Sequence, residues 1–553
     1  MTALDSLVPT RPAARWWRNS VIYQLYVKSF ADSDADGIGD LDGVTARLDH
    51  IAGLGVDGIW LNPCYPSPNR DGGYDVADYT RIDGRYGGMP AFERLLAATH
   101  ERGLKLLMDL VPNHCSDQHE WFQLALAAGP DSVERARYIF RDGRGQDGSE
   151  PPNNWRSTFG GSAWTRVSDE HGAHGQWYLH SFDSSQPDFN WDNPEVGELF
   201  DDVLRLWFDR GIDGFRIDVA YAMVKHAGLP DLLDPDGDNP YLWNQPGVHE
   251  IFKRWRVIAE SYDRDLTLLG EVWLPPTDAA DYIRAGELNQ VFYFDLLQQP
   301  YEAGAFRLSI DESLAGLKKG VEGVPTWTLN SHDVHRSISR YGLVEAEPMS
   351  SPDVNALRTR ARGRVDVELG TRRATAATLL LLALPGSVYL YQGEELGLPE
   401  VQELPAEARQ DPIWERSSHT EYGRDGCRVP LPWTVAGPNF GFGSADATGA
   451  PWLPQPDWFG GFAAERQDAD PSSVLSFYRR ALLARRQLDP ATPLEWLETG
   501  RDDVLAFRRG TLSCVTVFDG EPFAIPAAWG SLLCASQLGD GPLASGSTAW
   551  YQV

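Results

Sequence analysis

Cysteine is scarce in this sequence, with five residues among 553: Cys64, Cys115, Cys427, Cys514 and Cys534. No two of them have the close spacing of a metal site, and an odd number cannot be paired completely within one chain. These features exclude a small disulfide-stabilised module and favour a reducing compartment.

Long hydrophobic runs are also missing. The longest apolar run, residues 376–384, is far shorter than the roughly 20 residues that a membrane helix needs. The first 17 residues are polar, contain arginine and lack the apolar core of a secretory signal. We therefore expect a cytoplasmic protein without a membrane span.

Positive charge is in deficit: the sequence has 49 Lys and Arg residues but 79 Asp and Glu residues, which gives a net charge of −30. Such a charge repels phosphate backbones and anionic lipid, so nucleic acid and membrane surfaces are not expected partners. Twenty Trp and twenty Tyr are many for this length. They either fill a core or offer flat surfaces for sugar rings, and composition leaves both open.

One short pattern recurs: a helical stretch, a glycine, then an apolar run. It occurs before Gly55, Gly103 and Gly211, which lead into the runs 56–61, 104–109 and 212–218. Alternating helices and fully apolar strands indicate a parallel sheet. Further candidate strands are 21–30, 266–273, 291–297, 325–330 and 387–391. Eight such units predict an α/β fold, a (β/α)₈ barrel of the TIM type.

The spacing of these units also predicts the domain organisation. About 60 extra residues follow the third strand, so we expect a small inserted domain at 116–183. The barrel would comprise 1–115 and 184–487, ending in an amphipathic helix near 473–486. Short alternating stretches at 504–508 and 512–518 predict an antiparallel β domain at 488–553.

Acidic and histidine side chains close four of the predicted strands. They lie in Asp-Leu-Val-Pro-Asn-His at 109–114, Arg-Ile-Asp at 216–218, Gly-Glu at 270–271 and Asn-Ser-His-Asp at 330–333. A lone residue of this kind is most often a helix cap or a solvated charge. Because barrel enzymes carry their chemistry where strands end, four similar endings indicate one site.

Three carboxylates in an aromatic cavity suit glycoside hydrolysis, in which one attacks the anomeric carbon and a protonated one assists the leaving group. Arg216 stands two residues before Asp218 on a strand, points to the same side and can hold that carboxylate ionised. This favours Asp218 as the nucleophile.

At these motifs the chain resembles the α-amylase superfamily of glycoside hydrolases, and within it the α-glucosidase and oligo-1,6-glucosidase group. The likeness extends from about Trp16 to Trp458. It implies Asp218 as nucleophile, Glu271 as general acid/base and Asp333 as transition-state stabiliser. It further implies that His114, Arg216 and His332 contact the innermost sugar and that Phe182 is among the substrate-binding residues.

Further segments resemble the same group. Gln-Pro-Asp-Phe-Asn at 186–190 is similar to the group's Gln-Pro-Asp-Leu-Asn signature, which implicates Gln186 in substrate binding. Asp71 and Tyr74 match a stretch that grips the terminal sugar. The resemblance pairs that aspartate with an arginine that walls off the pocket. Arg424 and Arg428 are both candidates for it.

The loop at 32–40 places oxygens at alternate positions around a glycine, as a hard cation requires. It is not an EF-hand, because position 12 is Gly43 rather than Glu. It resembles the Ca²⁺ loop of oligo-1,6-glucosidases, which implies a structural Ca²⁺ held by Asp32, Asp34, Asp36, the Ile38 carbonyl and Asp40. No organic cofactor is expected.

The resulting prediction is a retaining, exo-acting α-glucosidase for small α-glucosides of the maltose or isomaltose type. Alternatives on the same scaffold are a transglucosidase, a sucrose-acting enzyme or an isomaltase. From a different class, a non-catalytic sugar-binding or transporter-associated relative would need a membrane helix and usually lacks the full carboxylate set. Zinc is disfavoured, because His114 and His332 lie on separate strands.

The residues after the nucleophile bear on the preferred linkage. Val219 resembles α-1,6-active relatives, whereas Ala220-Tyr221 departs from their usual Ile-Asn. The sequence does not indicate an oligomeric state.

Overall fold

The computed structural model describes residues 15–167, 175–317, 321–346, 362–444, 449–490, 492–539 and 541–553. The polar amino-terminal stretch, up to residue 14, therefore lies outside the described residues, as does part of the predicted insertion. Within the described ranges, none of the helices is both long enough and apolar enough to cross a membrane.

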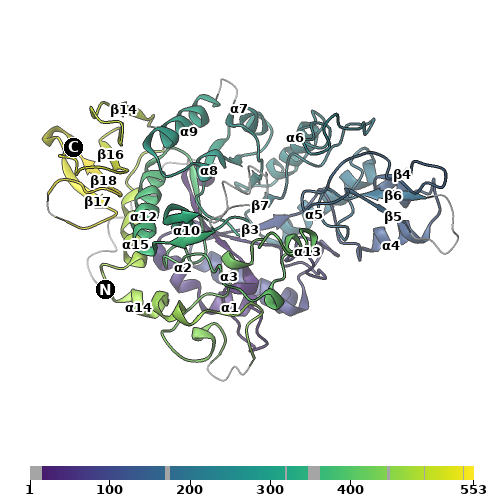
Figure 1. Cartoon of the computed structure of the whole chain (residues 1–553), viewed down its shortest axis with the longest axis horizontal. Coiled ribbons are helices and arrows are strands. Elements are labelled where there is room, and N and C mark those ends of the chain that lie inside the picture. Colours follow the sequence, from purple (N-terminus) through teal and green to yellow (C-terminus); the bar gives the residue numbers. More distant parts are fainter. Residues whose placement is uncertain are drawn as a thin grey trace.

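Eight parallel strands close into a barrel, which confirms the predicted fold (Figure 1). Their order around the barrel is β1-β13-β10-β9-β8-β7-β3-β2. The strands are β1 (Val21–Leu25), β2 (Gly58–Leu61), β3 (Lys105–Leu110), β7 (Gly214–Ile217), β8 (Thr267–Gly270), β9 (Gln290–Phe292), β10 (Val324–Trp327) and β13 (Ser387–Tyr391). Each corresponds to one of the eight predicted runs.

Several of those runs were predicted too long, and two of them continue five residues past the end of their strand. The run 21–30 is a strand only to Leu25, because the N–H of Tyr26 bonds to the Gln392 side chain instead of a neighbouring strand and a 3₁₀ turn (Val27–Ser29) follows. The run 291–297 ends as a strand at Phe292 and continues into the short helix α8 (Asp295–Gln298). Apolar composition alone cannot separate a buried strand from a buried turn of helix.

Helices surround the barrel (Figure 1). They are α1 (Leu41–Ala46), α2 (Leu48–Leu54), α3 (Gly88–Glu101), α5 (Pro194–Arg210), α6 (Val248–Glu260), α7 (Pro276–Ala279), α9 (Ala303–Ala315), α10 (Ser337–Tyr341), α12 (Val367–Ala383), α13 (Pro412–Arg416), α14 (Ala464–Asp468) and α15 (Val474–Arg485). Helix α5 shows why the repeated pattern is helical. Asn193 caps its first turn, Pro194 occupies the first position, and Gly211 ends it at φ 109°.

A three-stranded antiparallel sheet is inserted between β3 and β7 and lies at one end of the molecule (Figure 1). It contains β4 (Phe140–Asp142), β6 (Gln176–Leu179) and β5 (Trp164–Arg166) in that order, with α4 (Glu120–Ala127) before it. Its apolar side chains, including Trp155 and Trp164, share a core with Leu232 and Leu242 from the long loop after β7. The insertion therefore supports that loop.

The carboxyl-terminal sheet lies at the opposite end of the molecule (Figure 1). Its antiparallel order is β14 (Glu495–Leu497), β15 (Val504–Arg509), β16 (Leu512–Val517), β18 (Ser547–Gln552) and β17 (Ser531–Ala535). It packs on α12, where the indole N–H of Trp550 donates to the Leu379 carbonyl at 3.1 Å. A separate two-stranded sheet pairs β11 (Leu343–Ala346) with β12 (Gly363–Val365).

Candidate active site

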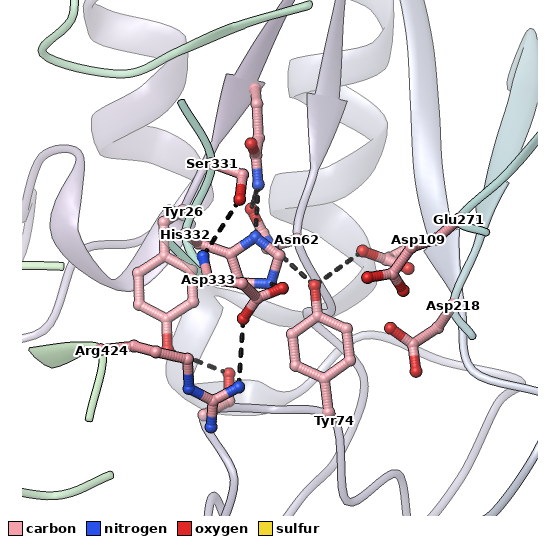
Figure 2. A network of polar contacts seen from close by, with 12 residues as sticks. Tyr26, Asn62, Tyr74, Asp109, Asp218, Glu271, Ser331, His332, Asp333 and Arg424 are labelled. Atoms are coloured by element: carbon pink, nitrogen blue, oxygen red, sulfur yellow. Dashed lines mark hydrogen bonds and ion pairs between the residues drawn. The ribbon is translucent and has the colours of Figure 1, made fainter. Parts of the chain in front are cut away.

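One buried guanidinium gathers three carboxylates at the carboxyl ends of neighbouring strands. Arg216 on β7 places Nη1 2.6 Å from Asp218 Oδ1 and 2.9 Å from Asp109 Oδ1, and Nη2 2.7 Å from Glu271 Oε2. The expected contact between Arg216 and Asp218 is present. Asp218 and Glu271 are held by adjacent nitrogens of one planar group. Figure 2 shows both side chains near Asp109.

Burial raises the pKa of Asp218 well above its ordinary value; Arg216 opposes this shift, and the charges of Glu271 and Asp109 add to it. Burial likewise raises the pKa of Asp109 to about 7, against the lowering effect of Arg216. Asp218 and Asp109 therefore bind a proton more readily than exposed aspartates do. The expectation that Arg216 by itself keeps Asp218 ionised is not met, because burial outweighs the guanidinium.

Glu271 is oriented by two N–H donors besides Arg216. The backbone N–H of Val219 donates to Oε2 at 2.9 Å, and the Trp273 indole donates to Oε1 at 2.8 Å. Val219 has φ 41°, a left-handed conformation that β-branched residues rarely adopt. The strained backbone directs this N–H at Glu271, a placement typical of functional sites.

Asp333 follows β10 and is surrounded by two arginines and a histidine. Its Oδ1 lies 3.1 Å from Arg424 Nη1 and 3.0 Å from Arg428 Nη2, and its Oδ2 lies 3.1 Å from His332 Nε2. Burial alone would raise the pKa of Asp333, but His332, Arg424 and Arg428 hold it well below its usual range. Asp333 is therefore ionised throughout the neutral range.

His332 is fixed by its neighbours on both sides. Its Nδ1 lies 2.7 Å from the amide nitrogen of Gln24, a donor, so the ring proton belongs on Nε2, which faces Asp333. Burial lowers the pKa of His332 well below its ordinary value. Tyr74 stacks on this ring at 5.2 Å between centroids and 6° between planes, and its hydroxyl donates to Asp109 at 2.9 Å (Figure 2).

The structure answers which arginine pairs with Asp71. Arg424 Nη2 lies 2.8 Å from Asp71 Oδ1, whereas Arg428 binds Asp333 and the His332 carbonyl. Burial raises the pKa of Asp71 to about 6, although Arg424 acts in the opposite direction. The remaining face of Arg424 is bound by Asp411 at 2.7 Å, so the guanidinium is held rigidly.

His114, Phe182 and Gln186 lie together on the side of the inserted sheet. The Gln186 amide nitrogen donates to Asp71 Oδ2 at 3.0 Å and lies 3.2 Å from His114 Nε2. Phe182 contacts the His114 ring at 5.1 Å. Burial lowers the pKa of His114 to about 4, so this ring is neutral at pH 7.

These groups surround a pocket of about 260 Å³. Nine of the twelve predicted catalytic and sugar-binding residues line it: Asp71, Tyr74, His114, Phe182, Asp218, Glu271, His332, Asp333 and Arg424. Gln186, Arg216 and Arg428 lie behind the lining and hold those residues in place. A larger hollow of about 1080 Å³, lined by Trp414, Tyr422 and Trp458, contains none of the three predicted catalytic carboxylates. Size alone therefore does not identify the site.

Sequence reasoning missed part of the site. Asp109 lies inside the quoted 109–114 motif, which could have identified it. The aromatic lining residues Phe159, Tyr221 and Trp243 come from loops without periodicity and gave no signal. A buried ion pair was also missed: Lys225 Nζ lies 2.9 Å from Asp188 Oδ2, and ties the loop after β7 to the 186–190 segment.

The acidic loop brings three of its predicted ligands together. Oxygens of Asp32, Asp34 and Asp40 lie within 4.8 Å of one another, which suits one hard cation. Asp36 is not part of this cluster; its carboxylate accepts the N–H of Ile38 at 2.8 Å. Asp40 also caps α1 by accepting the Gly43 N–H at 2.7 Å.

The chain is similar to known proteins over most of its length. Residues 24–492 match the family model described as alpha amylase, catalytic domain. A probable alpha-glucosidase from Rhizobium meliloti is 37% identical over 90% of this chain and 88% of its own length. An oligo-1,6-glucosidase from Parageobacillus thermoglucosidasius is 35% identical over 86% and 84% of the two chains.

Two solved structures are similar over nearly the whole chain. The alpha-glucosyl transfer enzyme XgtA superposes with a TM-score of 0.81 at 35% identity. The trehalulose synthase MutB from Pseudomonas mesoacidophila does so with a TM-score of 0.82 at 31% identity. Each comparison covers 98% of this chain and 100% of the other.

Proposed function

The chain belongs to the α-amylase family of glycoside hydrolases, and on that premise we propose that it is a retaining, exo-acting α-glucosidase. It removes terminal, non-reducing α-linked glucose from small oligosaccharides through a covalent glucosyl-enzyme intermediate. The observation that carries this proposal is the pair of carboxylates, Asp218 and Glu271, on one guanidinium at a small pocket.

In the proposed reaction Asp218 attacks the anomeric carbon as a carboxylate, and Glu271 delivers the proton of the cluster to the departing oxygen. Glu271 then takes a proton from water, which releases glucose from Asp218. Asp333, kept ionised by its cationic neighbours, binds sugar hydroxyls and stabilises the positive charge that develops on the ring. Arg216 compensates the negative charge of the cluster throughout.

The exo-acting mode rests on the ion pair between Asp71 and Arg424. Both residues line the pocket, and their contact at 2.8 Å joins two loops that are distant in sequence. A chain end fits against such a wall, whereas a continuous polysaccharide needs a groove that is open at both ends. Tyr74 and His332 supply the stacked surface for the innermost ring.

The stereochemistry of the first product tests the mechanism. A route in which Asp218 attacks directly and water then displaces it needs carboxyl groups about 5–5.5 Å apart and retains the α configuration. We therefore expect α-glucose as the initial product from maltose. Proton NMR recorded before mutarotation measures the anomer, and initial β-glucose would refute the covalent route.

Paired disaccharide substrates measure the linkage preference. Val219 favours a 1,6 linkage by crowding, but one methyl-sized contact contributes only about 1–3 kcal/mol of discrimination. We expect glucose release from both maltose and isomaltose, with kcat/KM values that differ by less than about a thousandfold. If kcat/KM for maltose and kcat/KM for isomaltose differ by more than about a thousandfold in either direction, the loops around the pocket control linkage.

Sucrose and trehalose, assayed side by side with them, test the sucrose-acting alternative, which the likeness to a trehalulose synthase favours. Added glucose as acceptor tests transglucosylation.

We further propose that the 32–40 loop holds a structural Ca²⁺, with Asp32, Asp34 and Asp40 as carboxylate ligands. Because the ion would bind only the folded chain, EDTA should lower the melting temperature more than it lowers turnover of protein that stays folded. The Asp34→Asn variant should show a smaller shift on chelation, since it has already lost one ligand. A melting temperature unaffected by exhaustive EDTA treatment would exclude the ion.

The cytoplasm is the proposed compartment. All five cysteines lie in described ranges, and each is buried and free. Free thiols are typical of reducing surroundings.

A further inference from the structure

Two aromatic side chains on the loop after β7 form a stacked pair at the pocket. The rings of Tyr221 and Trp243 lie 5.1 Å apart with 29° between their planes, and both residues line the pocket. Trp243 is partly exposed. The two residues are 22 positions apart in sequence, so the loop returns to place one ring on the other.

Tyr221 lies close to the reacting carboxylates. Burial, and then the negative charges of Glu271 and Asp218, raise the pKa of its hydroxyl, which therefore stays protonated. It is the third residue after Asp218 in the chain. The pair thus extends from the proposed acid and nucleophile along the wall of the pocket.

Trp243 also contacts Phe182, which lies where the pocket borders the inserted sheet. Its ring lies 6.4 Å from Phe182 in an edge-on arrangement, and Phe182 in turn contacts His114. The aromatic wall therefore runs from His114 through Phe182 to Trp243 and Tyr221. The last three members of this wall carry no charge, in contrast to the ion-paired groups that surround the innermost ring.

The loop holds Trp243 in place before any ligand binds. The N–H of Asn244 donates to the Tyr221 carbonyl at 2.8 Å, and the Tyr282 hydroxyl donates to Asn244 Oδ1 at 2.7 Å. The Gln245 amide donates to the Trp243 carbonyl at 2.9 Å. The neighbouring Leu242 is buried in the core of the inserted sheet. A preorganised ring loses little conformational entropy on binding.

We propose that the stacked pair of Tyr221 and Trp243 is the platform for the leaving sugar, and that it selects α-glucosides whose leaving group presents a flat ring face. This inference rests on the proposed α-glucosidase function. A sugar ring has an apolar face of C–H groups, which packs on aromatic surface, whereas the inner subsite recognises glucose by ion-paired and hydrogen-bonding groups.

A comparison of two substrates distinguishes the contribution of the platform from that of the inner subsite. Maltose leaves a glucose ring, whereas α-glucosyl fluoride delivers the same glucosyl unit and leaves only fluoride. In Trp243→Ala we expect the ratio of kcat/KM for maltose to kcat/KM for α-glucosyl fluoride to fall at least tenfold. Tyr221→Asn should lower the same ratio, and Trp243→Phe should restore most of it, since a flat ring remains.

The control is Trp458→Ala, because Trp458 is 38% exposed and lines the separate larger hollow. In this variant the ratio of kcat/KM for maltose to kcat/KM for α-glucosyl fluoride should equal that of the parent. With α-glucosyl fluoride as donor, the yield of disaccharide from added glucose should also fall in Trp243→Ala. An unchanged ratio, or equal losses on both substrates, would overturn the platform. A parent protein that hydrolyses neither substrate would instead overturn the proposed function.

Discussion

The Asp218→Asn variant should lose several orders of magnitude in turnover on maltose and on α-glucosyl fluoride alike, while its melting temperature changes little. The amide keeps the volume of the carboxylate but cannot form the covalent intermediate on which both substrates depend. Asp192→Asn, an exposed change before α5, is the matched control. Activity within tenfold of the parent in the folded variant would sink the nucleophile assignment.

Glu271→Gln should behave differently from Asp218→Asn. Fluoride departs without a proton, so its release from α-glucosyl fluoride should suffer much less than hydrolysis of maltose. Because the variant also lacks the base for the second step, we expect a burst of fluoride followed by slow turnover. Stopped-flow detection of fluoride measures the burst, and Glu93→Gln, an exposed change on α3, is the control. Equal losses on the two substrates would contradict the acid role.

Arg424→Met should lower kcat/KM for maltose by about a hundredfold or more, because Asp71 and Asp333 lose the group that positions them at the pocket, and a small misplacement of binding groups costs activity on this scale. The guanidinium is shared by Asp71, Asp333 and Asp411, and its loss leaves all three with less compensation. The kcat/KM of Arg424→Lys should fall between that of the parent and that of Arg424→Met, since lysine keeps the charge but lacks the planar set of N–H donors of the guanidinium. Arg466→Met, exposed on α14, controls for the loss of a surface arginine.

The pH dependence gives Arg424→Met a distinctive signature. The guanidinium stabilises the carboxylate form of Asp333, so its removal raises the pKa of that group. Since the proposed reaction needs Asp333 ionised, activity should disappear at a higher pH as the solution is acidified. We therefore expect the acid limb of kcat/KM against pH to move upward in Arg424→Met and much less in Arg424→Lys. An acid limb that does not move would show that Arg424 acts by shape alone.

Repeated local patterns explain why so much of the fold was predictable. A helical stretch, a glycine and an apolar run recur because each βα unit needs the same buried strand and the same helix end. The repeated pattern predicted three of the barrel strands, apolar runs predicted the other five, and amphipathic spacing predicted the last helix. The predicted runs overshoot most where an apolar run continues past the barrel, as after Leu25 and Phe292.

The sequence by itself determined the barrel and the residues that close its strands, because these depend on local spacing. Asp218, Glu271 and Asp333 were identifiable since each ends an apolar run in a distinctive motif. Only the tertiary structure decided which arginine meets Asp71, that Lys225 neutralises Asp188, and that Trp243 stacks on Tyr221. These contacts join residues between 22 and 353 positions apart on irregular loops. Such loops are positioned by packing against one another and by buried hydrogen bonds, which no short-range pattern of residues records.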